Sequence, residues 1–357
     1  MKRMTSIALV LALSIVLSGC PLTEGDVPLP TYTSESSESS SETSDAETTT
    51  VEETTEETIP EPSEPVAEFS GNAEDMIVFE ENTYYESEDF FIFFEKGSTV
   101  RGDTIENLTQ VMRDEEELFG MSYDSDYVIS DDDWRQIYFG GDFKYVNTDL
   151  SKPNILILKD PEDASICWAF GNEVMIFDTY TDPDNPEFQE TYHEFAHLLR
   201  LQQSGSLGST LEEGIAVYAQ YELCKNNNAP AWDMIQYLEG GLYDSPYDHS
   251  YIYADPEGEF VASSLAPRDG EHRDYNYGFR FVRYLVETYG IEMIDTISQC
   301  AREQDLNGDV QTDLLVQIIK ENTSETVFDD FAAWLPSGWD DFGREYADYM
   351  EQFGFEA

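Results

Sequence analysis

Two histidines and a glutamate are spaced as a metal-binding helix would space them. The residues are His193-Glu194-Phe195-Ala196-His197, in a chain that has only four histidines. On a helix, side chains four residues apart share one face, so His193 and His197 can bind a single metal ion while Glu194 points at a water on that ion. Zinc held in this way lowers the pKa of the water toward neutrality, and a neighbouring glutamate can take its proton. The pattern predicts a zinc hydrolase with Glu194 as its general base; the alternative is an exposed helix with two coincidental histidines.

The residues before the motif can begin the helix that the motif requires. Asp184-Asn185 offers an N-cap, and Pro186 suits a first helical position, where its missing N–H is not needed. Phe195 and Leu199 then give the helix an apolar side. We therefore expect a helix that starts at Pro186, packs against a sheet and carries both histidines in its middle turns.

A catalytic zinc also needs a third protein ligand and an open position for water. Glu213 is the main candidate, in Leu211-Glu212-Glu213-Gly214-Ile215-Ala216-Val217-Tyr218, and Glu212 is the alternative. This stretch follows the Gly-rich turn Ser204 to Gly208 and starts a second predicted helix. Acidic residues at a helix start are also favoured by the helix dipole, without any metal.

H-E-x-x-H followed by E-G-x-A-x-Y resembles the gluzincin metallopeptidases. The resemblance implies that Glu213 is the third zinc ligand and that the substrate is a peptide or protein. It also covers Tyr275-Asn276-Tyr277-Gly278, which is similar to the Y-x-x-G context of the aminopeptidase-like branch. This implies that Tyr275 donates a hydrogen bond to the oxyanion; Tyr277 is the alternative.

One stretch departs from the aminopeptidase pattern. Aminopeptidases of this class resemble one another in G-x-M-E-N, whose glutamate holds the free amine of the substrate. This chain has Gly171-Asn172-Glu173-Val174-Met175 instead. We therefore expect an endopeptidase rather than an aminopeptidase, with residues 174–177 as the edge strand that pairs with an extended substrate.

The first twenty residues predict export and a lipid anchor. Two positive charges precede the apolar run Ile7 to Leu17, which is too short to stay as a membrane span, and Leu17-Ser18-Gly19-Cys20 follows. The segment resembles a bacterial lipoprotein signal. This implies cleavage before Cys20 and a lipid on that residue, which would hold the protein on the outer face of a membrane. A plain secretory signal is the alternative.

Residues 21–75 are predicted to be a disordered tether. They are rich in Ser, Thr, Glu and Pro, and they hold 16 acidic and no basic side chains. Such a segment buries little and repels itself. Residues 76–357 carry 59 acidic against 16 basic side chains. This charge argues against nucleic acid as a partner and against docking on an anionic membrane surface.

The patterning after the tether predicts an α+β fold. Short apolar runs at 76–79, 90–94, 136–139, 154–158 and 174–177 indicate strands of a mixed sheet, with a helix starting near Asp103. Helical spacing then dominates, at 209–224, 278–289, 292–302, 309–320, 325–335 and 339–353. We expect a β-rich lobe with the motif helix over 76–207 and a helical lobe over 208–357.

Three cysteines follow the tether, at Cys167, Cys224 and Cys300. Because their number is odd, most of them are expected to be buried free thiols.

Three alternatives to a peptidase stay open from sequence. One is a catalytically silent relative that uses the same cleft to bind peptides or cell-surface material, although such a module has no need of Glu194. Another is a lipid-anchored solute-binding protein, which the lack of two βα-repeat halves disfavours. The third is a zinc hydrolase for non-peptide amides or esters, because the same water can attack any polarised carbonyl.

Overall fold

The computed structural model describes residues 69–123, 137–139, 143–145, 151–160, 167–170, 172–204, 207–232, 234, 254–265, 273–304 and 312–354. All of them belong to one compact unit, Pro62–Ala357. The predicted signal, the lipidation site Cys20 and the predicted tether up to residue 68 lie outside the described residues. Residues 69–75, predicted as the end of the tether, pack on the fold instead: the ring of Phe69 stacks on that of Phe94, and the backbone N of Gly71 donates a hydrogen bond to the carbonyl of Gly102. The predicted domain boundaries stay predictions.

A mixed sheet forms the first part of the fold. Its strands lie in the order β2-β3-β7-β9-β8, and they are β2 (Thr83–Glu86), β3 (Phe91–Phe94), β7 (Asn154–Leu158), β8 (Trp168–Phe170) and β9 (Glu173–Phe177). β3, β7 and β9 run parallel, and β2 and β8 are antiparallel to their neighbours. Every residue of β3, β7 and β9 is buried, as expected for parallel strands covered on both faces. The predicted mixed sheet is confirmed.

The predicted edge strand is an internal strand. β9 pairs with β7 on one side and with β8 on the other, so β8 takes the end of the sheet. The prediction was wrong because β8 has only three residues, too few to show a period in sequence. The end strand that flanks the motif helix is therefore Trp168–Phe170.

Two small strand pairs and one long helix complete this part. β1 (Met76–Val78) pairs with β4 (Thr99–Arg101), and β5 (Ile137–Phe139) pairs with β6 (Phe143–Tyr145). The helix predicted from near Asp103 is α2 (Thr104–Phe119). It ends at Gly120, whose φ of 65° is the left-handed conformation that terminates many helices.

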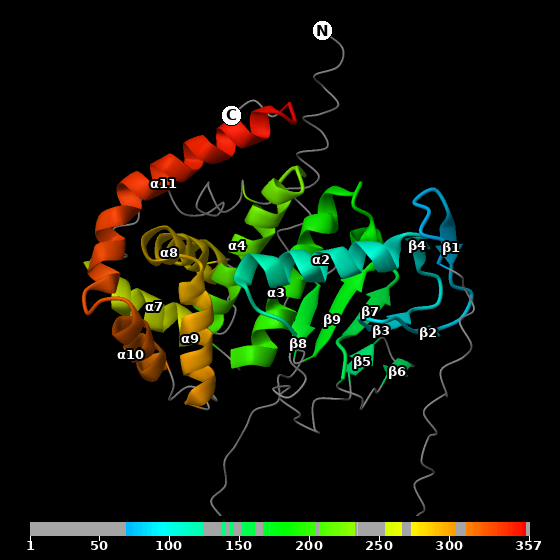
Figure 1. Cartoon of the computed structure of the whole chain (residues 1–357), viewed down its shortest axis with the longest axis horizontal. Helices are drawn as coiled ribbons and strands as arrows, with labels where there is room; N and C mark the ends of the chain where they lie inside the picture. The colour runs from blue at the N-terminus through cyan, green and yellow to red at the C-terminus, as the bar shows by residue number, and fades with distance from the viewer. Residues whose placement is uncertain are drawn as a thin grey trace, which may run out of the picture. The chain divides into compact units, whose positions relative to one another are not determined.

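The rest of the described chain is helical, which confirms the α+β class. Its helices are α3 (Gln189–Ser204), α4 (Ser209–Asn226), α7 (Pro256–Leu265), α8 (Arg273–Tyr289), α9 (Glu292–Glu303), α10 (Thr312–Asn322) and α11 (Val327–Glu351). In Figure 1, α7 to α11 gather on the side of α4 away from β1 to β4. No described helix is long and apolar enough to cross a membrane.

Two helices are longer than the sequence predicts. α8 begins at Arg273 rather than near residue 278, so Tyr275 lies inside its first turns. The helices predicted at 325–335 and 339–353 are one helix, α11, which continues through Pro336 (Figure 1). Proline removes one backbone hydrogen bond, but buried side chains on both sides hold the helix, including Phe331, Leu335, Trp339 and Phe342.

The three cysteines of this part are free thiols. Cys167 and Cys224 are buried, and Cys300 is partly buried. This agrees with the expectation from sequence that most of them are buried and unbridged.

Candidate metal centre

Helix α3 carries the H-E-x-x-H motif through the interior of the protein. The chain enters it by one 3-10 turn, η3 (Pro186–Phe188), where the side chain of Asn185 accepts a hydrogen bond from the backbone N of Glu187 at 3.0 Å. α3 contacts β8 and β9 as well as α4. Phe195 and Leu199 are completely buried. The predicted cap and the predicted packing on the sheet are both present, although the first turn is 3-10 rather than α-helical.

The structure brings His193, His197 and Glu213 together. The Nε2 atoms of the two histidines lie 3.1 Å apart, and each lies 3.2 Å from Oε2 of Glu213. Glu213 comes from α4, so the cluster joins two helices. All three side chains are buried, and Glu213 is completely so.

These three atoms suit zinc. Donors arranged tetrahedrally at about 2.0–2.1 Å from zinc lie about 3.3 Å from one another, close to the separations in this cluster. Two imidazole nitrogens and one carboxylate oxygen are also the donor set of many catalytic zinc sites. The residues present therefore fit the ion that the motif predicts.

The electrostatics of the cluster favour opposite charges on its members. Burial alone would lower the pKa of His197, but the Glu213 carboxylate raises it above the ordinary value. Burial would raise the pKa of Glu213, but the two histidines hold it well below its usual range. Glu213 is therefore an ionised carboxylate in a buried site, which is the form that binds a cation.

The alternative third ligand, Glu212, has a different role in the structure. Its Oε1 accepts a hydrogen bond from the backbone N of Leu207 at 2.7 Å. Burial raises its pKa, and the positive charge of Arg200 offsets part of that rise. No atom of Glu212 belongs to the cluster of donor atoms formed by Glu213 and the histidines. Glu212 thus stabilises the turn before α4, and the geometry favours Glu213 as the ligand.

Glu194, the predicted general base, lies beside the cluster. It is buried, with 6% of its surface exposed, and its charge contributes to the raised pKa of His197. Its charge also raises the pKa of the Cys167 thiol, after the larger effect of burial. A carboxylate next to a metal-binding face can accept a proton from water there.

The structure separates the two candidate tyrosines. The ring of Tyr275 stacks on the ring of His193, with the centroids 5.7 Å apart and an angle of 17° between the planes. Tyr277 is buried at 1% exposure, and its hydroxyl donates a hydrogen bond to the carbonyl of Pro256 at 2.8 Å. Tyr275 is therefore the tyrosine at the candidate metal centre, and Tyr277 supports the packing of α8 on α7.

Sequence reasoning missed a buried arginine next to the motif. Arg200 follows His197 by three residues on α3, is 1% exposed, and donates a hydrogen bond to Oγ of Ser298 on α9. Burial lowers its pKa, and Glu212 raises it. A charged residue at a helix position that faces the core could have signalled this contact. Arg200 links helix α3, which carries the motif, to α9 and to the start of α4.

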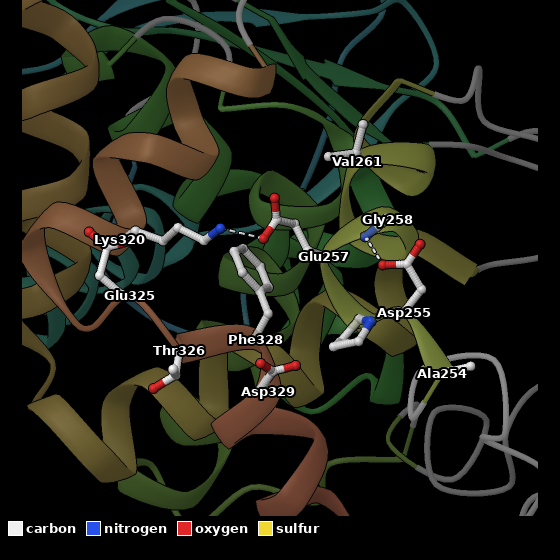
Figure 2. A pocket seen from close by; sticks show the side chains of 11 residues that line it. Ala254, Asp255, Glu257, Gly258, Val261, Lys320, Glu325, Thr326, Phe328 and Asp329 are labelled. Carbon is white, nitrogen blue, oxygen red and sulfur yellow. Dashed lines mark hydrogen bonds and ion pairs between the residues drawn. The ribbon is translucent and has the colours of Figure 1, made fainter.

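A separate cavity of about 490 Å³ lies among α7, α10 and α11 (Figure 2). Its lining includes an ion pair between Lys320 and Glu257, the ring of Phe328 and the carboxylate of Asp329. None of the predicted site residues lines it. The cavity is therefore distinct from the candidate metal centre.

Comparisons with known proteins find distant structural similarity and no family. No protein-family model matches the chain, and no curated protein sequence matches it. The chain is similar to an M1 zinc metallopeptidase from Deinococcus radiodurans, at 13% identity over 70% of this chain and 50% of that one, with a TM-score of 0.38. A two-domain M1 zinc metallopeptidase bound to L-arginine is 11% identical over 71% of this chain and 51% of that one, with a TM-score of 0.42. Yeast LTA4 hydrolase is 11% identical over 72% of this chain and 38% of that one, with a TM-score of 0.38.

The chain spans about half of the length of the two metallopeptidases and 38% of that of the hydrolase. At these identities and TM-scores the similarity assigns neither a family nor an activity. The functional proposal therefore depends on the residues of the candidate metal centre.

Proposed function

We propose that this protein is a membrane-anchored, extracytoplasmic zinc metallopeptidase of gluzincin type. The observation that carries the proposal is the buried cluster of His193, His197 and Glu213, whose metal-ligating atoms lie 3.1–3.2 Å apart. Glu194 lies beside the cluster, on the helix that carries both histidines. His193, His197 and Glu213 would hold the zinc. Such a cluster is costly to bury without a cation, because its charged and polar atoms are removed from water.

Glu194 and Tyr275 would each have a role in hydrolysis. A bound zinc would supply a Lewis acid that acidifies water and polarises a carbonyl oxygen. Glu194 would accept a proton from the attacking water and donate it to the leaving amine as the C–N bond breaks. The phenol of Tyr275, held against His193, would donate a hydrogen bond to the carbonyl oxygen as it becomes negative.

The substrate of this proposal is a peptide or protein, cleaved internally. β8 is the end strand of the sheet and contacts α3, so an extended peptide could pair with it through main-chain hydrogen bonds. The departure of residues 171–175 from the amine-holding motif of aminopeptidases supports an endopeptidase. The acidity of the chain favours neutral or basic substrates.

The proposed location is the outer face of a cell membrane. It is supported by the charged start, short apolar run and Leu17-Ser18-Gly19-Cys20 of the sequence. A lipid on Cys20 and a tether that ends before residue 69 would then hold the folded unit near the membrane without inserting it.

The proposal is tested by incubating the full-length protein, kept in detergent, with a mixed peptide library and by measuring hydrolysis. Glu194→Gln is the matched variant, because it keeps the size of the side chain and removes the base. We expect cleavage by the wild type and a loss of about 10²–10⁴-fold in the variant, with zinc retained in both. Zinc in both proteins with no cleavage by either would instead support a catalytically silent module that binds peptides. Cleavage of small esters or amides but of no peptide would support a non-peptide hydrolase.

A further inference from the structure

Helices α4 and α8 cross in direct backbone contact at two glycines. An added Cβ on Gly214 would lie 2.7 Å from Cα of Gly278 and would overlap its carbonyl group. An added Cβ on Gly278 would lie 2.9 Å from Cα and N of Gly214 and would overlap the carbonyl oxygen of Thr210. All of these neighbouring atoms belong to the backbone, so no side chain can turn away to make room.

The crossing lies next to two residues of the proposed site. Gly214 directly follows Glu213 on α4, and Gly278 follows Tyr275 by three residues on α8. Residues three apart lie on one side of a helix, so the face of α8 that touches α4 is also the face that presents Tyr275. Glu213 and Tyr275 both contact His193, through an Nε2–Oε2 distance of 3.2 Å and through ring stacking.

We propose that Gly214 and Gly278 are positioning residues, whose contact fixes the phenol of Tyr275 relative to the ligand cluster. The inference deepens the proposed function and rests on the role given there to Tyr275. Carbon atoms in normal contact are about 3.5–4.0 Å apart, so a methyl group at either glycine forces the helices apart by about 1 Å. A misplacement of that size costs about 10²-fold in rate.

The proposal predicts that the methyl group changes kcat and does not change zinc binding. The three predicted ligands lie on α3 and α4, and α8 carries none of them. The overlap of a methyl group at residue 278 lies between α8 and the backbone of α4, so it displaces α8 together with Tyr275, while the ligands His193 and His197 on α3 take no part in it. Tyr275 acts on the developing oxyanion, so the loss falls on kcat rather than on KM.

The test compares Gly278→Ala, Tyr275→Phe and the double variant in the full-length protein, with a fluorogenic peptide taken from the library as substrate. We expect Gly278→Ala to bind zinc like the wild type and to lose about 10²-fold in kcat, with KM changed less than about threefold. The double variant should lose no more than the larger of the two single losses, because both act through one phenol. Losses that multiply, or a kcat within about threefold of the wild type in a folded Gly278→Ala protein, would overturn the proposal.

Gly338→Ala is the matched control, since Gly338 is also inside a helix. A Cβ there would overlap the ring of Trp334, which is a partly buried side chain on the same helix and not the backbone of a neighbouring helix. This variant should keep the wild-type kcat. Gly214→Ala perturbs the same crossing from α4 and should reproduce the kcat loss of Gly278→Ala. If neither crossing variant folds, the glycines are needed for folding itself and the positioning role is rejected.

A spectroscopic measurement separates this inference from the proposed function. The chain has four histidines, so the ring signals of His193 can be resolved by NMR in a histidine-labelled sample. Stacking of Tyr275 shifts those signals by its ring current. Gly278→Ala should move them toward the position found in Tyr275→Leu, whether or not the protein cleaves peptides. An unchanged His193 signal would overturn the inference even in an active peptidase, and a shifted signal in a protein without zinc or activity would overturn only the proposed function.

Discussion

Oε2 of Glu213 lies 3.2 Å from Nε2 of His197, although the two residues belong to different helices. The contact joins His197, the last residue of H-E-x-x-H, to Glu213, the first residue of E-G-x-A-x-Y, across the interface between α3 and α4. Because Glu212 turns instead to the backbone of Leu207, neighbouring glutamates have different roles, and variants can distinguish them.

Glu213→Gln should lose most of its zinc affinity, and Glu212→Gln should keep it. The first change removes the anionic oxygen from the cluster, whereas the second removes a carboxylate that stabilises the turn before α4. Zinc affinity measured by competition with a chelating dye is the readout, and a loss of at least about 10²-fold is expected for Glu213→Gln. Equal zinc affinities of the two variants would contradict the assignment of Glu213.

Tyr275→Phe and Tyr277→Phe should have opposite effects. Tyr275→Phe should lower kcat by about 10²–10³-fold with little effect on stability, because it removes the predicted oxyanion donor. Tyr277→Phe should keep kcat but destabilise the fold by about 1 kcal/mol, because it removes a buried hydrogen bond to Pro256. Steady-state kinetics measures kcat, and urea unfolding measures the stability of the fold. A large loss of kcat in Tyr277→Phe alone would exchange the roles assigned to the two tyrosines.

Glu115→Gln should make the stability of the protein less dependent on pH. Glu115 is completely buried on α2, and burial, followed by the charge of Asp114, raises its pKa well above the ordinary value. Below the ordinary pKa of glutamate, of about 4.3, both the folded and the unfolded chain hold the proton. As the pH rises above that value, the unfolded chain releases the proton first, so the wild type loses stability until the pH passes the raised pKa of the folded state.

The free energy of unfolding in urea, measured from pH 4 to pH 8, checks this prediction. Glu115→Gln should gain stability relative to the wild type as the pH rises through this range. Glu117→Gln is the control, because it changes an exposed carboxylate on the same helix. Parallel pH profiles for Glu115→Gln and the wild type would contradict the prediction.

Cys20→Ala should release the protein from the membrane fraction. The lipid would be attached to the sulfur of Cys20, and a single acyl chain already contributes about 0.8 kcal/mol of membrane affinity per buried CH₂ group. Fractionation of expressing cells, with detection of the chain in membrane and soluble fractions, is the measurement. If the wild type is itself found only in the soluble fraction, the plain secretory signal is correct.

Local signals were enough to predict the helix that carries the motif. Asn185 and Pro186 mark the 3-10 turn that leads into it, and the spacing of His193 and His197 gives their common face. The strands β3, β7 and β9 were also visible as apolar runs, since strands buried on both faces are almost entirely apolar; only the first residues of β7 and β9, Asn154 and Glu173, are polar. These features depend on residues close together in the sequence.

Features that depend on distant contacts could not be predicted in this way. The order of β8 and β9 in the sheet is set by pairing, and the choice between Tyr275 and Tyr277 depends on which one reaches His193. The continuity of α11 through Pro336 depends on the core on both sides of it. The contact of Gly214 with Gly278 joins two segments 64 residues apart in the printed sequence, and neither glycine shows this locally.

The zinc content of the purified full-length protein tests the central claim most directly. Native mass spectrometry should show one zinc per chain in the wild type, and His197→Ala should lose it, because two donors are too few for a stable buried zinc site. A wild-type protein that binds no zinc at neutral pH, or a His197→Ala variant that binds it as tightly as the wild type, would contradict the account.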